Sequence, residues 1–201
     1  TIYGDHNPGT YNALRAGGLR LAAPAMILEF AKGFVAGQLA KGMLAANPAR
    51  AAIVAEDDAR VVATDITYPG DGVEMKGYMV VPAGNPGKLP AVIVVHENRG
   101  LNAHIKDVAR RFALEGFVVL APDFLSPLGG TPADEEKARE MFGQLEAAKT
   151  AANGVATVAF LAGNEATNGK VGAVGFCWGG GTVGDIAVAA PDLDAAVVYY
   201  G

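Results

Sequence analysis

The one cysteine of this chain, Cys177, stands in the segment Gly-Phe-Cys-Trp-Gly-Gly that spans residues 175–180. An apolar run typical of a buried strand, residues 171–174, precedes this segment, and a run compatible with a helix follows it. A strand, a sharp turn flanked by glycines and a helix form the elbow that exposes a nucleophile at the top of a sheet. Because glycines lack Cβ atoms, strand and helix can approach closely around a strained turn. We therefore predict that the thiol of Cys177 is a nucleophile; the alternative is a small cysteine buried at the end of a strand.

The groups that would assist this thiol are incomplete in the sequence. In this architecture a catalytic acid and then a histidine follow the nucleophile along the chain. The 24 residues after Cys177 contain three aspartates and no histidine, and all three histidines of the chain lie upstream. Among these, His96 and His104 are minor candidates for the base. We expect the chain alone to be inactive and a C-terminal segment, either a continuation or a separate chain, to supply the acid and the histidine.

Alternating strands and helices would position the elbow. Residues 61–68 and 73–81 are rich in β-branched and aromatic residues and flank a Pro-Gly-Asp-Gly turn, which predicts an antiparallel hairpin. Further strands are expected at 91–95, 117–120, 170–174 and 195–200, and helices at 102–115, 132–161 (with a break at 153–154) and 179–190. This alternation predicts an α/β fold with a mostly parallel sheet and helices on both faces.

Three of the loops in this pattern follow predicted strands directly. They are residues 96–100, residues 123–130 and the turn at Cys177. Ligands of open parallel sheets bind outside the carboxyl ends of the strands. We therefore expect these three loops to lie together at one edge of the sheet and to form the site.

The N-terminal part of the chain differs from this pattern. Glycines and a proline in residues 1–20 predict an irregular arm, whereas residues 25–46 and 48–58 predict helices. We therefore divide the chain into a helical N-terminal extension, 1–58, and an α/β core, 59–201. The first fifty residues carry a net charge of +3 and the rest carry −8. The extension is expected to lie on the acidic body or to mediate oligomerisation; the alternative is an ordinary solvated face.

Composition limits the class of protein. Hydrophobic residues make up 51% of the chain and charged residues 18%, which is typical of a globular protein. A net charge of −5 argues against general nucleic-acid binding. We expect no transmembrane span, because the apolar stretch 21–46 is interrupted by a proline and by charged residues. We expect a cytoplasmic protein, with the periplasm as the alternative, since a chain that starts at Thr1 can result from processing.

Three segments together resemble the dienelactone hydrolase family of α/β-hydrolases. They are His-Glu-Asn-Arg-Gly at 96–100, Ala-Pro-Asp at 121–123 and the elbow at 175–180. The resemblance covers roughly residues 60–201. It implies an α/β-hydrolase fold, which this chain would carry in a form truncated after its sixth strand.

The resemblance also assigns roles to individual residues. Cys177 would be the nucleophile, and Glu97 the active-site glutamate that contacts the thiol and helps to control its ionisation. The backbone N–H groups of Asn98 and Trp178 would form the oxyanion hole. No cofactor and no metal ion is implied.

These features lead to the hypothesis of an ester or lactone hydrolase that acts through a thioester on Cys177. The alternative is a catalytically incomplete fragment or a non-enzymatic, thiol-bearing scaffold. Arg99 is expected to form a salt bridge rather than to bind an anionic substrate, and Asp123 to stabilise its loop. The expected partners are a small-molecule ester or lactone, a complementary C-terminal segment and a second copy of the chain. A sheet left open at its last strand predicts poor solubility of this chain by itself.

Overall fold

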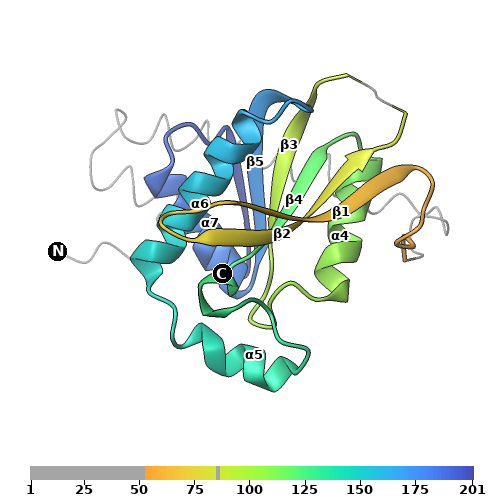
Figure 1. Ribbon diagram of the computed structural model, residues 1–201. Coiled ribbons are helices and arrows are strands. Elements are labelled where there is room, and N and C mark those ends of the chain that lie inside the picture. Colours follow the sequence, from red (N-terminus) through yellow and green to blue (C-terminus); the bar gives the residue numbers. More distant parts are fainter. Residues whose placement is uncertain (1–52, 85–86) are drawn as a thin grey trace. The chain divides into compact units, whose positions relative to one another are not determined.

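Six strands form one sheet in the part of the chain that the computed structural model describes, residues 53–84 and 87–201 (Figure 1). The order across the sheet is β1-β2-β4-β3-β5-β6. The strands are β1 (Val61–Pro69), β2 (Glu74–Pro82), β3 (Leu89–Val95), β4 (Val118–Asp123), β5 (Thr167–Phe176) and β6 (Ala195–Tyr199). The helices are α4 (Ala103–Leu114), α5 (Glu135–Phe142), α6 (Ala147–Ala162) and α7 (Trp178–Ala189), with a 3-10 turn at Ser126–Leu128.

The sheet has an antiparallel hairpin at one side and parallel strands elsewhere. β1 pairs antiparallel with β2 along its whole length, which confirms the predicted hairpin. The Gly70 N–H closes the turn by donating to the Val73 carbonyl at 2.7 Å. β2 is antiparallel to β4, whereas β4, β3, β5 and β6 run parallel to one another. The mostly parallel sheet expected from the alternating pattern is therefore confirmed.

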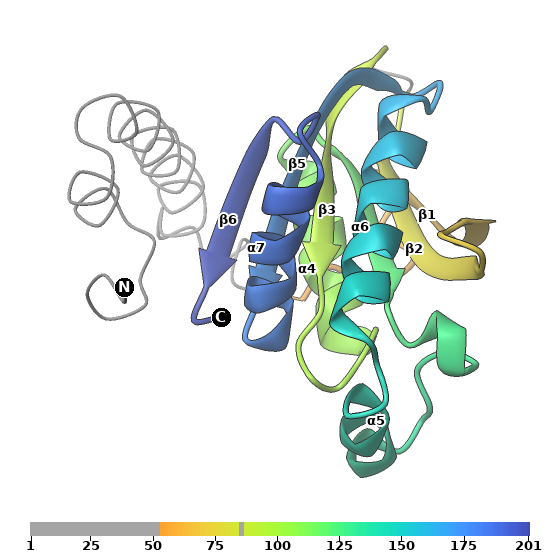
Figure 2. The same cartoon turned by 90° about the vertical axis from the view of Figure 1, so that its left-hand side faces the viewer.

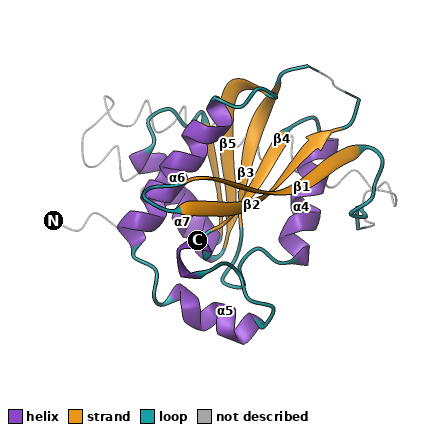
Figure 3. Cartoon of the chain, in the orientation of Figure 1, coloured by secondary structure: helices purple, strands orange, loops and turns teal. Residues whose placement is uncertain are grey.

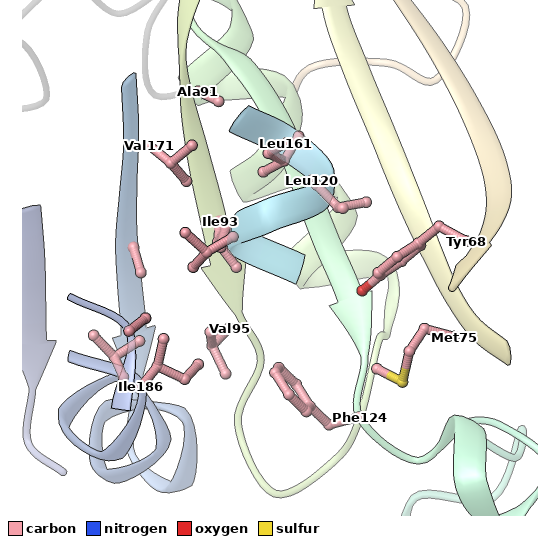
Figure 4. Close-up of a cluster of buried hydrophobic side chains, with 14 of the residues drawn as sticks. Tyr68, Met75, Ala91, Ile93, Val95, Leu120, Phe124, Leu161, Val171 and Ile186 are labelled. Carbon is pink, nitrogen blue, oxygen red and sulfur yellow. The ribbon is translucent and has the colours of Figure 1, made fainter. Parts of the chain in front are cut away.

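Helices cover both faces of this sheet. α6 and α7 pack on one face and α4 packs on the other, as Figures 2 and 3 show. Side chains alternate along a strand, so β3 serves both layers. Its Ile93 belongs to the main hydrophobic cluster with Leu161 of α6 and Ile186 of α7 (Figure 4), while Val92 and Val94 are buried on the other side. A strand buried on both faces requires the continuous apolar run that the sequence displays.

The helix expected over 132–161 is two helices, α5 and α6. The break expected at Asn153 and Gly154 is wrong, because both residues lie inside α6. Gly154 fits there because the side chain of Ile186 occupies the space that a Cβ atom would need. The Asn153 side chain accepts a hydrogen bond from the Asp71 N–H at 2.8 Å. Both residues are buried, so tertiary contacts outweigh their low helix propensity.

The arm predicted at 1–20 and the helix predicted at 25–46 lie outside the described residues. The helical extension therefore stays a prediction for residues 1–52. Within residues 53–84 and 87–201, no helix is both long and apolar enough to cross a membrane.

The described end of the helix predicted at 48–58 is not helical: residues 53–58 are irregular, with a turn at 56–57. The reason lies in Val54, whose backbone binds side chains of α4. The Val54 N–H donates to the Asp107 carboxylate at 2.8 Å, and its carbonyl accepts from the Arg110 guanidinium at 2.8 Å. These two buried partners satisfy the backbone groups that a helix would pair internally.

Candidate active site

Cys177 lies on a strained turn between β5 and α7. Its φ is 54° and its ψ is −122°, and its side chain is half-buried. Hydrogen bonds on both sides hold this backbone: the Cys177 N–H donates to the Tyr199 carbonyl at 3.0 Å, and its own carbonyl accepts from the Gly180 N–H at 2.9 Å. Among the described residues other than glycine, only Cys177 and Tyr200 have a positive φ. Such strain persists where the surrounding structure fixes it, and it is common at functional sites.

Glycines flank the cysteine because strand and helix approach too closely for side chains. A Cβ atom on Gly175 would overlap the backbone of Gly179. A Cβ on Gly179 would lie 2.6 Å from the Val95 carbonyl oxygen, and one on Gly180 would lie 2.7 Å from the Tyr199 carbonyl oxygen. These obstacles are backbone atoms, which cannot move aside as a side chain can. The glycine frame therefore has the physical role inferred from the sequence.

Glu97 and Tyr200 meet at the same edge of the sheet as Cys177. The Tyr200 hydroxyl donates to Glu97 Oε1 at 3.4 Å. Desolvation, then the negative charge of Glu97 and its hydrogen bond, and then the charge of Cys177 raise the pKa of the Tyr200 phenol above its usual 10.0. The phenol is therefore a neutral donor at neutral pH. Cys177, Glu97 and Tyr200 follow β5, β3 and β6, so three parallel strands bring them to one edge of the sheet.

Tyr200 is a site residue that the sequence analysis missed. The last strand was expected to include Tyr200, whereas β6 ends at Tyr199. The first residue beyond a parallel strand lies at the ligand-binding edge. Because the strand was expected to extend to residue 200, that rule pointed to Gly201 instead, and Tyr200 was overlooked by one position.

The two predicted oxyanion donors lie in the segments expected for them. Asn98 follows Glu97 in the loop after β3, and Trp178 is the first residue of α7. N–H groups in the first turn of a helix have no partner within the helix, so the Trp178 N–H is free to serve a ligand. Their action as a pair of donors stays a prediction.

The described histidines do not serve the thiol as a base. His96 is completely buried, and both of its ring nitrogens are engaged: Nδ1 with the Glu97 carbonyl at 2.9 Å, and Nε2 with the Phe124 N–H at 3.1 Å. His104 lies exposed in the first turn of α4. Neither has a hydrogen bond to Cys177. In the described part of the chain, no group of three or more His, Cys, Asp or Glu could hold a metal ion.

Asp123 stabilises the loops around the site, as expected. Its carboxylate accepts from the Leu125 N–H at 3.0 Å, from the Thr131 N–H at 2.7 Å and from the Thr131 hydroxyl at 2.8 Å. The Thr131 hydroxyl oxygen in turn accepts from the Leu101 N–H at 2.9 Å. The loop after β4 is thereby tied to the loop that carries Glu97.

Arg99 forms the expected salt bridge, with its Nη1 3.1 Å from Glu135 Oε2. Both side chains are about half exposed, so the pair contributes on the order of 0–1 kcal/mol to stability.

A hollow of about 380 Å³ lies elsewhere on the molecule. It is lined by Val81, Pro82, Gly87, Lys88, Leu89, Val118, Glu165 and Ala166. Leu89 and Val118 begin their strands, so this hollow lies at the amino edge of the parallel sheet, remote from Cys177.

The six-stranded sheet, with helices on both faces, defines the fold as that of an α/β-hydrolase. The family model described as "Dienelactone hydrolase family" matches residues 75–201. The chain belongs to this family. A second model, "Glycerol-3-phosphate acyltransferase", matches residues 1–63, less than a third of the chain's length and mostly outside the described residues.

Curated relatives and solved structures agree with the family. "Putative hydrolase fragment YghX" of Escherichia coli K12 is 51% identical over 107 residues, which cover 52% of this chain and 91% of that protein. "Putative carboxymethylenebutenolidase" of the same organism is 35% identical over 161 residues, which cover 78% of this chain and 59% of that protein. A putative dienelactone hydrolase from Klebsiella pneumoniae superposes with a TM-score of 0.61 at 30% identity, covering 70% of this chain and 60% of the other. The chain thus spans about three fifths of the carboxymethylenebutenolidase that it matches.

Proposed function

We propose that this chain carries the nucleophile of an ester or lactone hydrolase and that the nucleophile is Cys177. The proposal rests on one observation: a half-buried thiol on a positive-φ residue at the N-terminus of α7, at the same sheet edge as Glu97. Membership of the dienelactone hydrolase family supports this chemistry. Relatives named carboxymethylenebutenolidase support a lactone or ester as the substrate class.

The reaction would proceed through a thioester. The Cys177 thiolate attacks the carbonyl carbon, a C–S bond forms, and the carbonyl π electrons move to the oxygen. The backbone N–H groups of Asn98 and Trp178 would bind that oxyanion, because preorganised donors stabilise developing charge. Collapse of the intermediate breaks the C–O bond, and the departing alkoxide takes a proton. Water then hydrolyses the thioester, which releases the acid and restores the thiol.

The proton transfers require a base that the described residues do not place at Cys177. His96 has both ring nitrogens engaged, and His104 lies exposed on another helix. We assign the base and its orienting acid to a C-terminal segment that accompanies these residues in the complete protein. The three-fifths coverage of the carboxymethylenebutenolidase relative supports this assignment.

Trapping the acyl-enzyme tests the proposal. The complete protein is mixed with an activated aryl ester, quenched in acid within milliseconds and digested for mass spectrometry. We expect the mass of the acyl group on the peptide that contains Cys177, and we expect hydroxylamine to remove it. If the complete protein hydrolyses the ester while the acyl group resides on another residue, Cys177 is not the nucleophile. If the complete protein neither hydrolyses the ester nor becomes acylated, the hydrolase proposal is wrong, and the alternative of a non-enzymatic, thiol-bearing scaffold takes its place.

Replacing Tyr200 by phenylalanine is expected to slow alkylation of Cys177 at pH 7 about two- to fivefold. The substitution removes one hydrogen bond from the Glu97 carboxylate, worth on the order of 0.5–1 kcal/mol at an exposed site. Without this bond, the negative charge of the carboxylate is less well neutralised. A less neutralised negative charge near Cys177 makes its thiolate form less favourable. The rate of iodoacetamide labelling measures the effect.

Tyr199→Phe is the matched control for this measurement. It removes a neighbouring hydroxyl while keeping the ring that stacks on Phe176 at 5.1 Å. Equal labelling rates for the Tyr200 and Tyr199 variants would show that the contact between Tyr200 and Glu97 has no influence on the thiol.

A further inference from the structure

The buried ring of His96 contacts three of the segments near the site, besides its own loop. It stacks on Trp178 of the elbow helix, with ring centroids 5.5 Å apart and planes inclined by 12°. It meets the edges of two phenylalanines, Phe124 after β4 at 5.9 Å and Phe142 at the end of α5 at 5.6 Å. The side chain has no exposed surface. A polar ring at such a junction needs partners for both nitrogens, because an unpaired buried polar group is costly.

The hydrogen bonds of His96 select one tautomer. The Phe124 N–H donates to Nε2 at 3.1 Å, so Nε2 must be unprotonated. Nδ1 lies 2.9 Å from the Glu97 carbonyl oxygen, which can only accept, so Nδ1 must carry the proton. Only a neutral imidazole protonated at Nδ1 satisfies both contacts.

The bond to Glu97 helps to orient a predicted oxyanion donor, together with the bond that the same carbonyl accepts from the Gly100 N–H at 3.3 Å. The Glu97 carbonyl and the Asn98 N–H belong to the same planar peptide group. In a trans peptide these two groups point in opposite directions, so a bond that fixes the carbonyl also fixes the direction of the N–H. The same imidazole stacks on the indole ring of Trp178. The backbone N–H of Trp178 is the second predicted oxyanion donor.

We propose that His96 is a positioning residue, which in its neutral form holds the Asn98 peptide and the Trp178 segment in register as the two halves of the oxyanion hole. The proposal rests on the function proposed above, which supplies the oxyanion. His96 does not touch the substrate or Cys177. It acts through Glu97, Phe124 and Trp178.

Acid would disrupt this arrangement. Burial lowers the pKa of His96 below 6.5, while its bond to the Glu97 carbonyl and the charge of Asp123 act in the opposite direction. The residues facing the ring from α5 and α7, Phe142 and Trp178, carry no charge. A protonated ring would turn an N–H toward the Phe124 N–H and lose that bond. In the unfolded chain the histidine has a pKa of about 6.5, which is higher than its pKa in the folded protein. As the pH falls below about 6.5, the unfolded chain therefore binds the proton more readily, and the folded protein loses stability until the pH reaches the folded-state pKa.

A titration of tryptophan fluorescence tests the placement of the ring without any assay of activity. Trp178 is the only tryptophan of the chain, and a positive charge gained on a ring stacked on its indole quenches its emission. The full chain with His6→Gln and His104→Gln keeps His96 as its only histidine. We expect one protonation step in its emission, with a midpoint below pH 6.5, and no such step after the further substitution His96→Gln. A step that survives His96→Gln would overturn the proposal.

Kinetics of the complete protein test the role of the two hydrogen bonds. Glutamine offers a donor NH₂ group and an acceptor oxygen and does not titrate, whereas the leucine side chain offers neither donor nor acceptor. We expect His96→Leu to lower kcat about 10²-fold with little change in KM, as expected for a misplaced oxyanion donor. We expect kcat of His96→Gln to be at least tenfold higher than that of His96→Leu. We also expect kcat of His96→Gln not to decline at acid pH, whereas kcat of the wild type declines when His96 becomes protonated.

The outcomes separate this proposal from the proposed function. Wild-type kcat in a folded His96→Leu variant, or equal losses in folded leucine and glutamine variants, would overturn the positioning role. If leucine prevents folding, the pH profiles of the wild type and His96→Gln decide, and identical acid limbs would overturn it. Complete lack of ester hydrolysis by the wild type would remove the proposed function, while the fluorescence titration would still report whether the neutral ring is stacked as described.

Discussion

Replacing Cys177 by alanine is expected to lower kcat for ester hydrolysis in the complete protein by at least about 10⁴-fold. Removing a nucleophile abolishes the covalent route and leaves only the contribution of the oxyanion hole and of substrate binding. Because the side chain is only half-buried and lies outside the main hydrophobic cluster, the melting temperature should change little. Initial rates with an aryl ester and a thermal melt of the same preparation measure the two effects.

Cys177→Ser separates loss of the nucleophile from loss of sulfur chemistry. The serine hydroxyl is slightly smaller than the thiol but takes nearly its place, and it ionises far less readily, so it depends more strongly on a base. We expect its activity to lie between those of the alanine variant and the wild type. Wild-type rates in a correctly folded alanine variant would exclude the thioester mechanism.

The elbow was predictable because the reasons for its sequence are local. The residues around Cys177 must turn sharply from β5 into α7, and the glycines that permit this turn are neighbours in the chain. The strands were predictable for a related reason: burial on both faces demands a continuous apolar run, as in β3 and β4. The positions of Cys177, Glu97 and the loop at Asp123 followed from the rule that ligands bind at the carboxyl ends of parallel strands.

The remaining features depend on partners far away in the sequence. Tyr200 reaches Glu97 across 103 residues of chain, and no local pattern marks that contact. The segment around Val54 forms no helix because two side chains of α4, more than fifty residues away, bind its backbone. Gly154 stays inside a helix because Ile186 fills the adjoining space. In each case a tertiary contact outweighs a local propensity, which a pattern read from one sequence does not contain.

The close approach of α7 to β3 leads to the last prediction, on stability. Gly179→Ala should lower the free energy of unfolding by about 1–3 kcal/mol, the usual cost of overpacking a filled core. Its Cβ would lie 2.6 Å from the Val95 carbonyl oxygen and nearer still to that of His96. To relieve the clash, the elbow helix must move away from β3, the strand that precedes Glu97, so kcat should fall as well.

Gly184→Ala in the same helix provides the matched control, because a Cβ at Gly184 has no atom within 4 Å. Alanine stabilises a helix interior by about 0.5–1 kcal/mol relative to glycine. The same substitution, five residues apart in α7, should therefore change stability in opposite directions, and urea unfolding followed by circular dichroism measures both. Equal effects at the two positions would mean that strand and helix are not in contact at Gly179. In that case the glycines would not be what allows the strained turn at Cys177.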